Sequence, residues 1–334
     1  MKLGLMGCGV VADYGHLPAI ARTDGLECVA LYDPDAERLA AAQAKFGIAQ
    51  AFTDAEAFAA CGLDAVTITS PATYHGQNAA VAAAHGLPAL CEKPLALDEA
   101  GAEAMIAVAE AAGVPLWVGF DYRFSPVSAT IARLVAEGAV GTVRDLRLVY
   151  LWDLHGIYLR GQDGVFNERR EGRMLETGPM ADCGVHQIDL ARFWTGSEVV
   201  GAQAVGVWVE AYDAPDHMYL HLDHADGAHT LVEISYSYGA PCPTACSTFV
   251  YEVIGTDGLI RYDRERREFW LRNRSGHTDL PFAGEKNFDG MYAELARVLA
   301  VGGETTLPTA RDGLIATRLA TQATDELIAQ RRKP

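Results

Sequence analysis

Two short motifs contain residue types suited to moving a proton and stabilising a charge. One is the tripeptide EKP at residues 92–94, which places Lys93 directly after an apolar run. The other is DCGVHQID, in which Asp182, His186 and Asp189 follow one another at spacings of four and three residues. On a helix, residues at these spacings share one face. The second motif therefore favours a histidine general base oriented by a carboxylate, and a buried histidine that Asp189 merely satisfies is the alternative.

The position of Lys93 indicates a ligand site. The apolar run before it predicts a buried parallel strand, and ligands bind at the carboxyl ends of such strands. A surface lysine paired with Glu92 is the alternative. No metal site is predicted, because His186 lacks a second histidine for a facial triad and the C-x-x-x-C spacing at 242–246 stands alone.

A glycine-containing loop near the start of the chain predicts dinucleotide binding. Gly7, Gly9 and Ala12 follow an apolar strand and precede a helix, which is the order of the dinucleotide fingerprint. In that fingerprint the helix N-terminus receives the pyrophosphate. A methyltransferase or a flavoprotein places glycines similarly, whereas a phosphate-binding P-loop would need Gly-Lys-Ser/Thr. The candidate cofactor-binding residues of this loop are Gly7, Gly9, Val10, Val11 and Ala12.

Asp33 ends the next predicted strand, where a carboxylate would accept hydrogen bonds from the ribose hydroxyls. A helix N-cap before Pro34 is the alternative. A 2′-phosphate would be repelled here, because two unit charges about 4 Å apart interact by roughly 4 kcal/mol at an effective dielectric of about 20. The sequence therefore predicts NAD in preference to NADP.

The elements that position these residues change character along the chain. Up to Phe120, short apolar strands alternate with alanine-rich helices that end at Gly47 and Gly113, which predicts a doubly wound parallel sheet of Rossmann type. Beyond it, apolar and polar residues alternate, which predicts an α+β domain with a large, mostly antiparallel open sheet. The expected strands cover 3–7, 27–33, 64–70, 88–92, 115–120, 143–152, 202–212, 218–224, 229–238, 248–255, 258–263 and 268–272.

Three segments are predicted from this pattern. Residues 1–120 form the NAD-binding domain, and 121–308 form the substrate and oligomerisation domain. Residues 309–334 form a C-terminal helix that packs back on the first domain. Further helices are expected at 125–138 and from about Asp182.

Composition narrows the class of protein. A formal net charge of -17 argues against nucleic acid and anionic membranes as partners. No apolar run reaches the roughly 20 residues that span a bilayer, and no signal peptide is recognisable. The seven cysteines are scattered, which is typical of reduced thiols in a cytoplasmic protein.

Taken together, the motifs resemble those of the Gfo/Idh/MocA oxidoreductases, named for glucose–fructose oxidoreductase, inositol dehydrogenase and a rhizopine-catabolism protein. The resemblance covers nearly the whole chain, with the motifs in the family's order. It rests on GCGVVA at 7–12, SPATYH at 70–75, EKP at 92–94, YRFSP at 122–126 and DCGVHQIDL from Asp182.

The resemblance implies roles for individual residues. Lys93 corresponds to the lysine that contacts the reacting hydroxyl and the nicotinamide ribose, and His186 corresponds to the general acid/base. Asp182 corresponds to a substrate-binding carboxylate. The remaining implied residues lie beside the cofactor (Ser70, Pro71, His75, Glu92) or in the segment that links the domains at the active site (Tyr122, Arg123).

One segment departs from the family. Many members carry Gly-Gly shortly before the histidine motif, whereas this chain has MLETGPMADCGVH, and a charged loop precedes it. Arginines in that loop would suit an anionic substituent on the substrate, and solvated loop residues are the alternative. The residues concerned are His155, Tyr158, Arg160, Arg169 and Arg173, of which His155 and Arg169 are the candidate substrate contacts.

The expected function is an NAD-dependent dehydrogenase that oxidises a secondary hydroxyl of a sugar, a cyclitol or a derivative. One alternative is an enzyme of the same fold that retains its NAD, such as a transient-oxidation hydrolase or an epimerase. Another is a dinucleotide-binding sensor without turnover. Aromatic residues along the second sheet predict a homodimer or homotetramer through its open face.

Overall fold

The computed structural model describes residues 1–156, 174, 178–240 and 242–331, which divide into two compact units. The first unit comprises Met1–Phe124 and Lys286–Thr317, and the second comprises Ser125–Glu285 and Arg318–Pro334. The sequence prediction assigns 121–308 to the second domain, whereas the structure groups 286–317 with the first unit.

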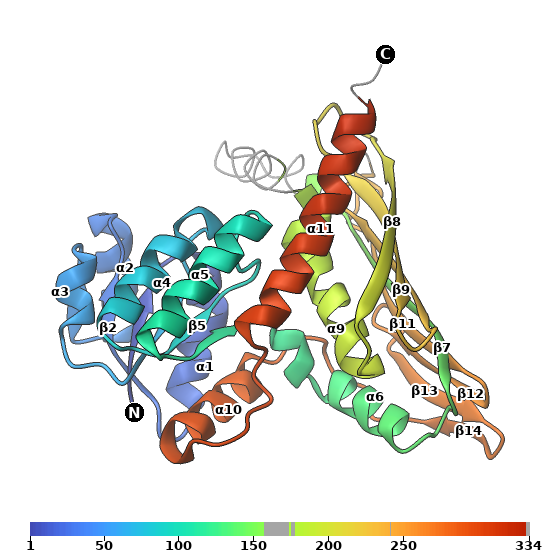
Figure 1. Cartoon of the computed structure of the whole chain (residues 1–334), viewed down its shortest axis with the longest axis horizontal. Coiled ribbons are helices and arrows are strands. Elements are labelled where there is room, and N and C mark those ends of the chain that lie inside the picture. The colour runs from blue at the N-terminus through green and yellow to red at the C-terminus, as the bar shows by residue number, and fades with distance from the viewer. Residues whose placement is uncertain (157–173, 175–177, 241, 332–334) are drawn as a thin grey trace. The chain divides into compact units, whose positions relative to one another are not determined.

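A parallel six-stranded sheet organises the first unit, with the strand order β3-β2-β1-β4-β5-β6. Figure 1 labels β2 and β5 of this sheet, with α2, α4 and α5 beside them. The order reverses beside β1, which creates the crevice where doubly wound folds bind their ligands. The predicted Rossmann-type sheet is confirmed, although β3 was not predicted because three residues show no periodicity. The strands are β1 (Lys2–Met6), β2 (Glu27–Tyr32), β3 (Gln50–Phe52), β4 (Ala65–Ile68), β5 (Ala89–Cys91) and β6 (Leu116–Val118).

Helices connect these strands, and their ends follow local chemistry. Asp98 caps α5 by accepting a hydrogen bond from the Gly101 N–H at 2.7 Å. Gly47 and Gly113 end α2 and α5 in the left-handed conformation, as predicted. The helices are η1 (Ala12–His16), α1 (Leu17–Arg22), α2 (Ala36–Phe46), α3 (Ala55–Ala59), η2 (Ala72–Tyr74), α4 (His75–Ala84), α5 (Glu99–Ala112) and η3 (Asp121–Phe124).

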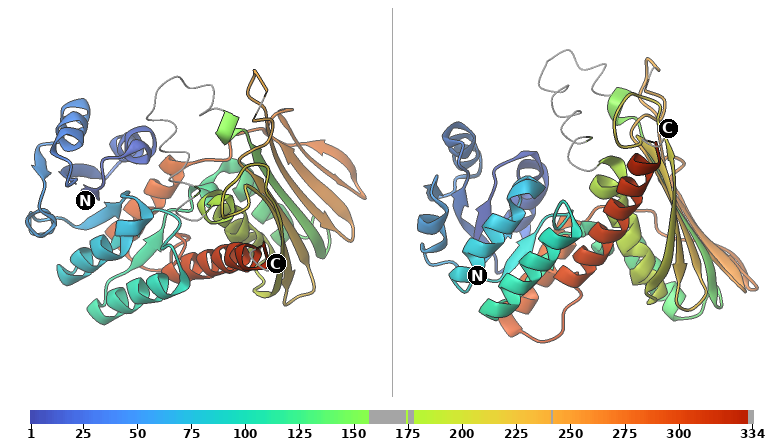
Figure 2. Two further views of the ribbon diagram at one scale, coloured as in Figure 1. Left: turned by 90° about the horizontal axis from the view of Figure 1, so that it is seen from above. Right: turned by 45° about the horizontal axis from the view of Figure 1, so that its top comes forward.

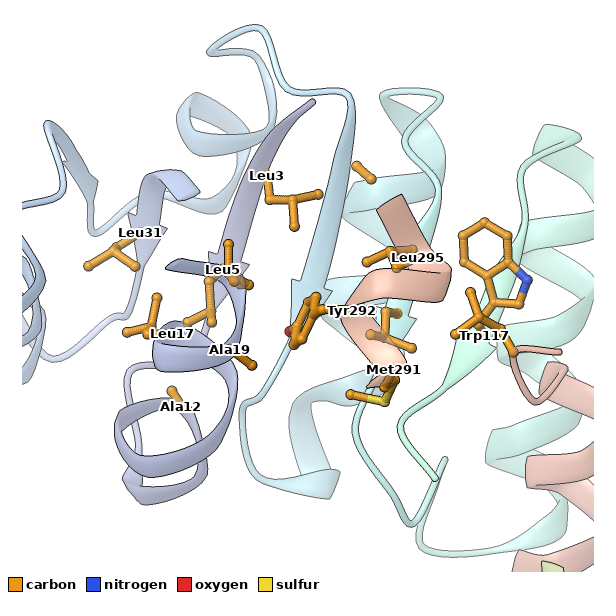
Figure 3. Close-up of a cluster of buried hydrophobic side chains, with 14 of the residues drawn as sticks. Leu3, Leu5, Ala12, Leu17, Ala19, Leu31, Trp117, Met291, Tyr292 and Leu295 are labelled. Carbon is orange, nitrogen blue, oxygen red and sulfur yellow. The ribbon is translucent and has the colours of Figure 1, made fainter. Parts of the chain in front are cut away.

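A helix from late in the chain completes the core of the first unit. Helix α10 (Phe288–Val301), which the sequence analysis did not predict, inserts Met291, Tyr292 and Leu295 among the side chains of β1 and α1 (Figure 3). Burying one such side chain contributes about 1.5–3 kcal/mol. This packing explains why 286–317 belong to the first unit.

The second unit is built on an eight-stranded sheet with the order β14-β13-β12-β11-β7-β10-β9-β8. Its pairs are antiparallel except for β10 with β7, which confirms the predicted mostly antiparallel sheet. The strands are β7 (Val143–Trp152), β8 (Val199–Val207), β9 (His217–His224), β10 (His229–Ser235), β11 (Ser247–Gly255), β12 (Gly258–Asp263), β13 (Glu268–Asn273) and β14 (Gly276–Asp279).

Two predicted strands of this sheet are too long, and one of them, β10, ends at Ser235 rather than at residue 238. Strand β8 ends at Val207 rather than continuing to residue 212. The reason is Asp216, whose carboxylate accepts hydrogen bonds from the N–H groups of Val209 and Glu210 at 2.8 and 3.0 Å. In a longer strand, these N–H groups would be available to the hydrogen bonds between strands. Because they donate to Asp216 instead, the chain leaves the sheet at this point.

Helices of the second unit gather on one face of its sheet. Strand β9 alternates, with Met218, Leu220 and Leu222 fully buried. In Figure 2, α9 (Val185–Thr195, yellow-green) lies against the sheet, and the opposite face carries no helix of the described residues. Helix α6 (Pro126–Ala136) packs against α9.

The C-terminal helix α11 (Ala310–Arg331) has residues in both units. A side chain at Gly313 would lie 2.6 Å from Val118, so the first turns pack on β6. Thr324 lies 3.7 Å from Met218 of β9, so the later turns pack on the second sheet. Within the described residues, no helix combines the length and apolar character needed to cross a membrane.

Candidate active site

The loop after β1 has the tight turn that the fingerprint requires. Gly7 has φ +105°, and its N–H donates to the Tyr32 carbonyl at 2.7 Å. A Cβ at Gly7 would lie 2.5 Å from the backbone nitrogen of Ser70. Glycine is needed here for its conformation and for the close approach of two backbones.

Gly9 is needed for a different reason. A Cβ built on Gly9 meets no atom within 4 Å, so the space above this residue is open. Val10 is exposed, Val11 is the N-cap of η1, and Ala12 is fully buried against the core. Open space at a helix start, where N–H groups lack acceptors within the helix, fits the pyrophosphate of a dinucleotide.

Asp33 lies at the end of β2 and is only 2% exposed. Its carboxylate accepts hydrogen bonds from the Cys8 N–H at 2.8 Å and the Asp35 N–H at 2.9 Å. The alternative role as a helix N-cap is wrong, because Asp35 caps α2. Each carboxylate oxygen keeps a further lone pair, so Asp33 has the capacity to accept from ribose hydroxyls.

A buried cluster joins the loop after β4 to the loop after β5. The Nε2 of His75 lies 2.9 Å from the Ser70 carbonyl, and its Nδ1 lies 3.1 Å from the Pro94 carbonyl. Burial lowers the pKa of His75, and the carbonyls of Ser70 and Leu95 act in the other direction. Asn78 donates to Ser70 Oγ at 3.0 Å, a contact that the sequence analysis missed. His75 therefore contacts both loops. Pro71, in the loop after β4, is exposed.

The EKP motif follows β5 at the carboxyl edge of the sheet. The backbone N–H of Lys93 donates to Glu92 Oε2 at 3.1 Å, and the Lys93–Pro94 peptide bond is cis. The Lys93 side chain is partly exposed, whereas Glu92 is buried. In the alternative, a surface lysine paired with Glu92, the partner carboxylate is thus a buried one.

Tyr122 and Arg123 lie in η3, at the end of the first unit's N-terminal segment. Tyr122 is buried, and the Arg123 guanidinium lies 3.5 Å from the Asp312 carboxylate at the start of α11. This ion pair holds the guanidinium against a carboxylate of its own unit.

In the second unit, the histidine motif begins in the π-helical turn η4 (Met180–Gly184) and continues into α9. Asp182 is half-buried, and His186 and Asp189 are buried. The hydroxyl of Tyr236, just beyond β10, donates to Asp182 Oδ2. The helical placement of Asp182 and His186 was predicted, but the tyrosine that holds the carboxylate was not.

The loop residues suggested as substrate contacts fall into two groups. His155 is fully buried, with Nδ1 3.4 Å from Glu210 Oε1, and its backbone N–H donates to the Tyr236 carbonyl at 2.9 Å. The structure thus links His155 to the residue that holds Asp182. The others lie outside the described residues: Tyr158, Arg160, Arg169 and Arg173.

Each unit contains its own group of the predicted site residues. The first has an open helix start, a buried carboxylate just after β2 and a lysine at one sheet edge, all of which fit a nicotinamide dinucleotide. The second provides a histidine and a carboxylate on one helical segment. Among the described residues, no group of three or more His, Cys, Asp or Glu side chains is arranged to hold a metal ion. These features define an oxidoreductase with an NAD-binding Rossmann domain.

Comparisons with known protein families agree with this class of protein. A model of the GFO/IDH/MocA family matches residues 1–120. Its description is "Oxidoreductase family, NAD-binding Rossmann fold". The model of the GFO/IDH/MocA C-terminal domain matches residues 128–261. The chain belongs to the GFO/IDH/MocA family.

Several relatives are dehydrogenases. The chain is 35% identical to a D-apiose dehydrogenase from Paraburkholderia graminis over 82% of this chain and 70% of that protein. It is 30% identical to the rhizopine catabolism protein MocA from Rhizobium meliloti over 98% and 95% of the two chains. An oxidoreductase from Agrobacterium radiobacter, solved with NAD+, L-tartaric acid and magnesium, matches with a TM-score of 0.82 at 26% identity over 99% and 97% of the chains.

Proposed function

We propose that this protein is an NAD-dependent dehydrogenase that oxidises a secondary hydroxyl of a sugar, a cyclitol or a derivative. The observation that carries the proposal is Lys93 at the carboxyl edge of the sheet whose first loop is open at Gly9. A cation at this edge suits a reaction in which negative charge develops on an oxygen beside the nicotinamide.

The mechanism assigns separate tasks to the two reactive side chains. His186 removes the hydroxyl proton, and Asp182 binds the substrate while its own position is held by Tyr236. Lys93, as an ammonium ion, stabilises the alkoxide oxygen as the proton leaves. NAD supplies the acceptor for the hydride from the same carbon. Tyr122, Arg123, His155 and Arg169 are proposed to shape the substrate side of the site.

The cofactor is proposed to be NAD rather than NADP. Asp33 is buried and its carboxylate accepts hydrogen bonds from two backbone N–H groups, which fix its position. A fixed negative charge at this position accepts from ribose hydroxyls and repels a 2′-phosphate.

The substrate class follows the relatives. D-Apiose is the first candidate, because a D-apiose dehydrogenase is 35% identical to this chain. Inositols are the second candidate, because a myo-inositol dehydrogenase from Streptomyces leeuwenhoekii is 32% identical over 65% of this chain. We further propose a homodimer or homotetramer formed through the open face of the second sheet, in the cytoplasm.

The test is nicotinamide absorbance with NAD or NADP and a panel of sugars, cyclitols and sugar acids, with His186→Ala as a blank. Reduction of NAD by one panel member, absent in the blank, supports the dehydrogenase. Silence across the panel, with NAD still bound after purification, supports instead an enzyme that oxidises its substrate transiently and retains the cofactor.

A further inference from the structure

Two of the seven cysteines differ from the others in exposure. Cys242 and Cys246 are exposed, and both are present as thiols. The other cysteines are buried or partly buried: Cys8, Cys28, Cys61, Cys91 and Cys183. A thiol reacts only where a reagent reaches it, so Cys242 and Cys246 are the cysteines best placed for thiol chemistry.

Both exposed cysteines lie in the loop that joins β10 to β11. These two strands pair with β7 from opposite sides, and the two ends of the loop meet neighbouring residues of β7. Ser235 pairs with Leu151, and Ser247 pairs with Trp152. Because the sheet holds both ends of the loop, its cysteines explore less space than they would in an open chain.

The backbone of the loop brings both cysteines to Gly239. Gly239 has φ +71°, and its carbonyl accepts a hydrogen bond from the Cys242 N–H at 2.8 Å. The Cys246 thiol donates to the carbonyl of Tyr238, the residue before this glycine, at 3.6 Å. Cys242 is thus held by the backbone on one side of Gly239, and Cys246 is held on the other side.

The two sulfur atoms converge at Gly239. A Cβ built on Gly239 would overlap Cys246 Sγ and would lie 3.8 Å from Cys242 Sγ. The two sulfurs therefore lie within about 6 Å of each other. Because both side chains are exposed, rotation about their Cα–Cβ bonds can bring the sulfurs to the roughly 2 Å of a disulfide bond.

The buried cysteines are held as unreactive thiols. Burial raises the pKa of the Cys8 thiol to about 12, and it raises the pKa of the Cys28 thiol to about 12 as well. The thiolate is the form that attacks a disulfide, so these two cysteines resist thiol–disulfide exchange at neutral pH.

A zinc site is the other common use of two neighbouring cysteines. Structural zinc takes four ligands, most often Cys and His. In the part of the chain that the structure describes, no cluster of three or more His, Cys, Asp or Glu side chains could hold a metal ion. Two thiols alone do not complete such a site, so the arrangement favours redox chemistry.

We propose that Cys242 and Cys246 are a redox-modification site: they form a reversible disulfide by exchange with a small-molecule disulfide. The thiolate of one cysteine attacks a sulfur of the small disulfide, a mixed disulfide forms, and one small thiol leaves. The thiolate of the other cysteine then attacks the protein sulfur of the mixed disulfide and releases the second small thiol. The protein loses two electrons and two protons, and the small disulfide gains them as two thiols.

This site lies on the segment that follows Tyr236. The Tyr236 hydroxyl donates to Asp182 Oδ2. Disulfide formation removes the Cys246 thiol as the donor to the Tyr238 carbonyl, two residues beyond Tyr236. The modification therefore changes the loop next to the tyrosine that holds Asp182.

The test follows both thiols by mass spectrometry without any substrate. The full-length protein is equilibrated with mixtures of reduced and oxidised glutathione, and the remaining thiols are then alkylated. Trypsin releases the peptide from Phe193 to Arg261, which contains Cys242 and Cys246 as its only cysteines. As the glutathione becomes oxidised, we expect this peptide to lose two hydrogens and both alkyl groups, and a reducing dithiol should restore them.

Single substitutions distinguish an internal disulfide from separate oxidation of the two cysteines. Cys242→Ser or Cys246→Ser removes the second attack, so a mixed disulfide with glutathione should accumulate on the remaining cysteine. Cys61→Ser is the control, because Cys61 is partly buried and belongs to the first unit. This variant should form the Cys242–Cys246 disulfide as readily as wild type.

Two outcomes would overturn the proposal. One is a wild-type peptide that stays fully alkylated in oxidised glutathione, and the other is a peptide that carries two glutathiones. A disulfide between two copies of the chain, seen on a non-reducing gel, would count against it in the same way. Because labelling needs no turnover, silence of the substrate panel would weaken only the proposed dehydrogenase.

Discussion

The two units hold the side chains proposed to react by different means. Beside Lys93, the supporting groups come from parts of the chain that are far apart. Glu92 Oε1 lies 2.9 Å from His16 Nε2, and His16 Nδ1 lies 2.7 Å from the hydroxyl of Tyr292, which is 276 residues away. In the second unit, Asp182 precedes His186 by one helical turn, and the hydroxyl of Tyr236, just beyond β10, donates to the Asp182 carboxylate. A parallel sheet edge collects residues from every crossover, whereas a helix brings together residues that are close in sequence.

This difference has a consequence for mutations. Support for Lys93 is spread over a buried ionic network, so removing one member leaves an uncompensated charge. Support for Asp182 includes one hydroxyl that can be removed without disturbing the helix. Substitutions in the two units test this difference between the support of Lys93 and the support of Asp182.

Removing either reactive side chain should have the largest effect. Lys93→Ala and His186→Ala should each lower kcat at least about 100-fold while NAD still binds, because each acts mainly as charge develops on the hydroxyl oxygen. Steady-state kinetics and NAD titration measure the two quantities. Lys45→Ala is the control, because that exposed lysine pairs with Asp13 at the surface, at 2.6 Å. Near-normal turnover in either test variant would remove the role assigned to it.

The two glycines of the first loop should respond differently to the same methyl group. Gly7→Ala should lower the free energy of unfolding by about 2–3 kcal/mol, because the residue has φ +105° and lies against the Ser70 backbone. Gly9→Ala should leave stability unchanged and weaken NAD binding at least about tenfold, because the methyl group fills open space. Urea unfolding and NAD titration separate the outcomes, and equal effects of both variants would contradict the assignment.

In the second unit, Tyr236→Phe should lower kcat/KM about tenfold, because Asp182 loses the hydroxyl that donates to it. NAD affinity should not change. Tyr262→Phe is the matched control, since its hydroxyl donates at 2.9 Å to the Ala283 carbonyl in the same unit. If both variants reacted like wild type, the proposed support of Asp182 by Tyr236 would be wrong.

Cofactor choice should depend on the charge of Asp33. Asp33→Asn keeps one acceptor oxygen and removes the negative charge, so the preference for NAD over NADP should fall about tenfold. The ratio of kcat/KM for the two cofactors measures this change. Asp35→Asn is the control, because Asp35 caps α2 and is largely exposed. An unchanged ratio would show that another group selects the cofactor.

The smallest effect concerns stability in acid. Hydrogen bonds from Arg297, Thr305 and Thr306 lower the pKa of Glu294 from 4.5 to about 2. Because the folded-state pKa is the lower one, this stabilisation is complete above about pH 5 and is lost as the pH falls toward about 2. Glu294→Gln should cost about 1 kcal/mol at neutral pH, since solvent screens the partly exposed pair. Denaturant midpoints at both ends of this range test it, and a constant difference across pH would contradict the linkage.

Several features of the site were predictable from local patterns. The order strand, glycine loop, helix was predicted near the start of the chain, and the spacing of Asp182 and His186 placed both on one helical segment. The structure confirms both arrangements, and the binding roles of these residues stay predictions. These predictions succeeded because backbone periodicity and helix spacing are properties of neighbouring residues.

Other features depended on distant contacts. Asn78, His16 and Tyr236 were not identified, although His16 lies four residues after Ala12, which is a weak signal. Helix α10 was missed as well. Its residues complete the core of the first unit, and nothing in the local sequence assigns them to that core.

The sequence by itself determined the Rossmann-type sheet, the family, the nucleotide loop and the two motifs that contain the reactive side chains. Only the tertiary structure decided which buried groups surround Lys93 and which hydroxyl holds Asp182. The physical reason is that hydrogen bonding and burial act through space. The charge of Glu92 is therefore set by neighbours such as His16, which the sequence separates from it by dozens of residues.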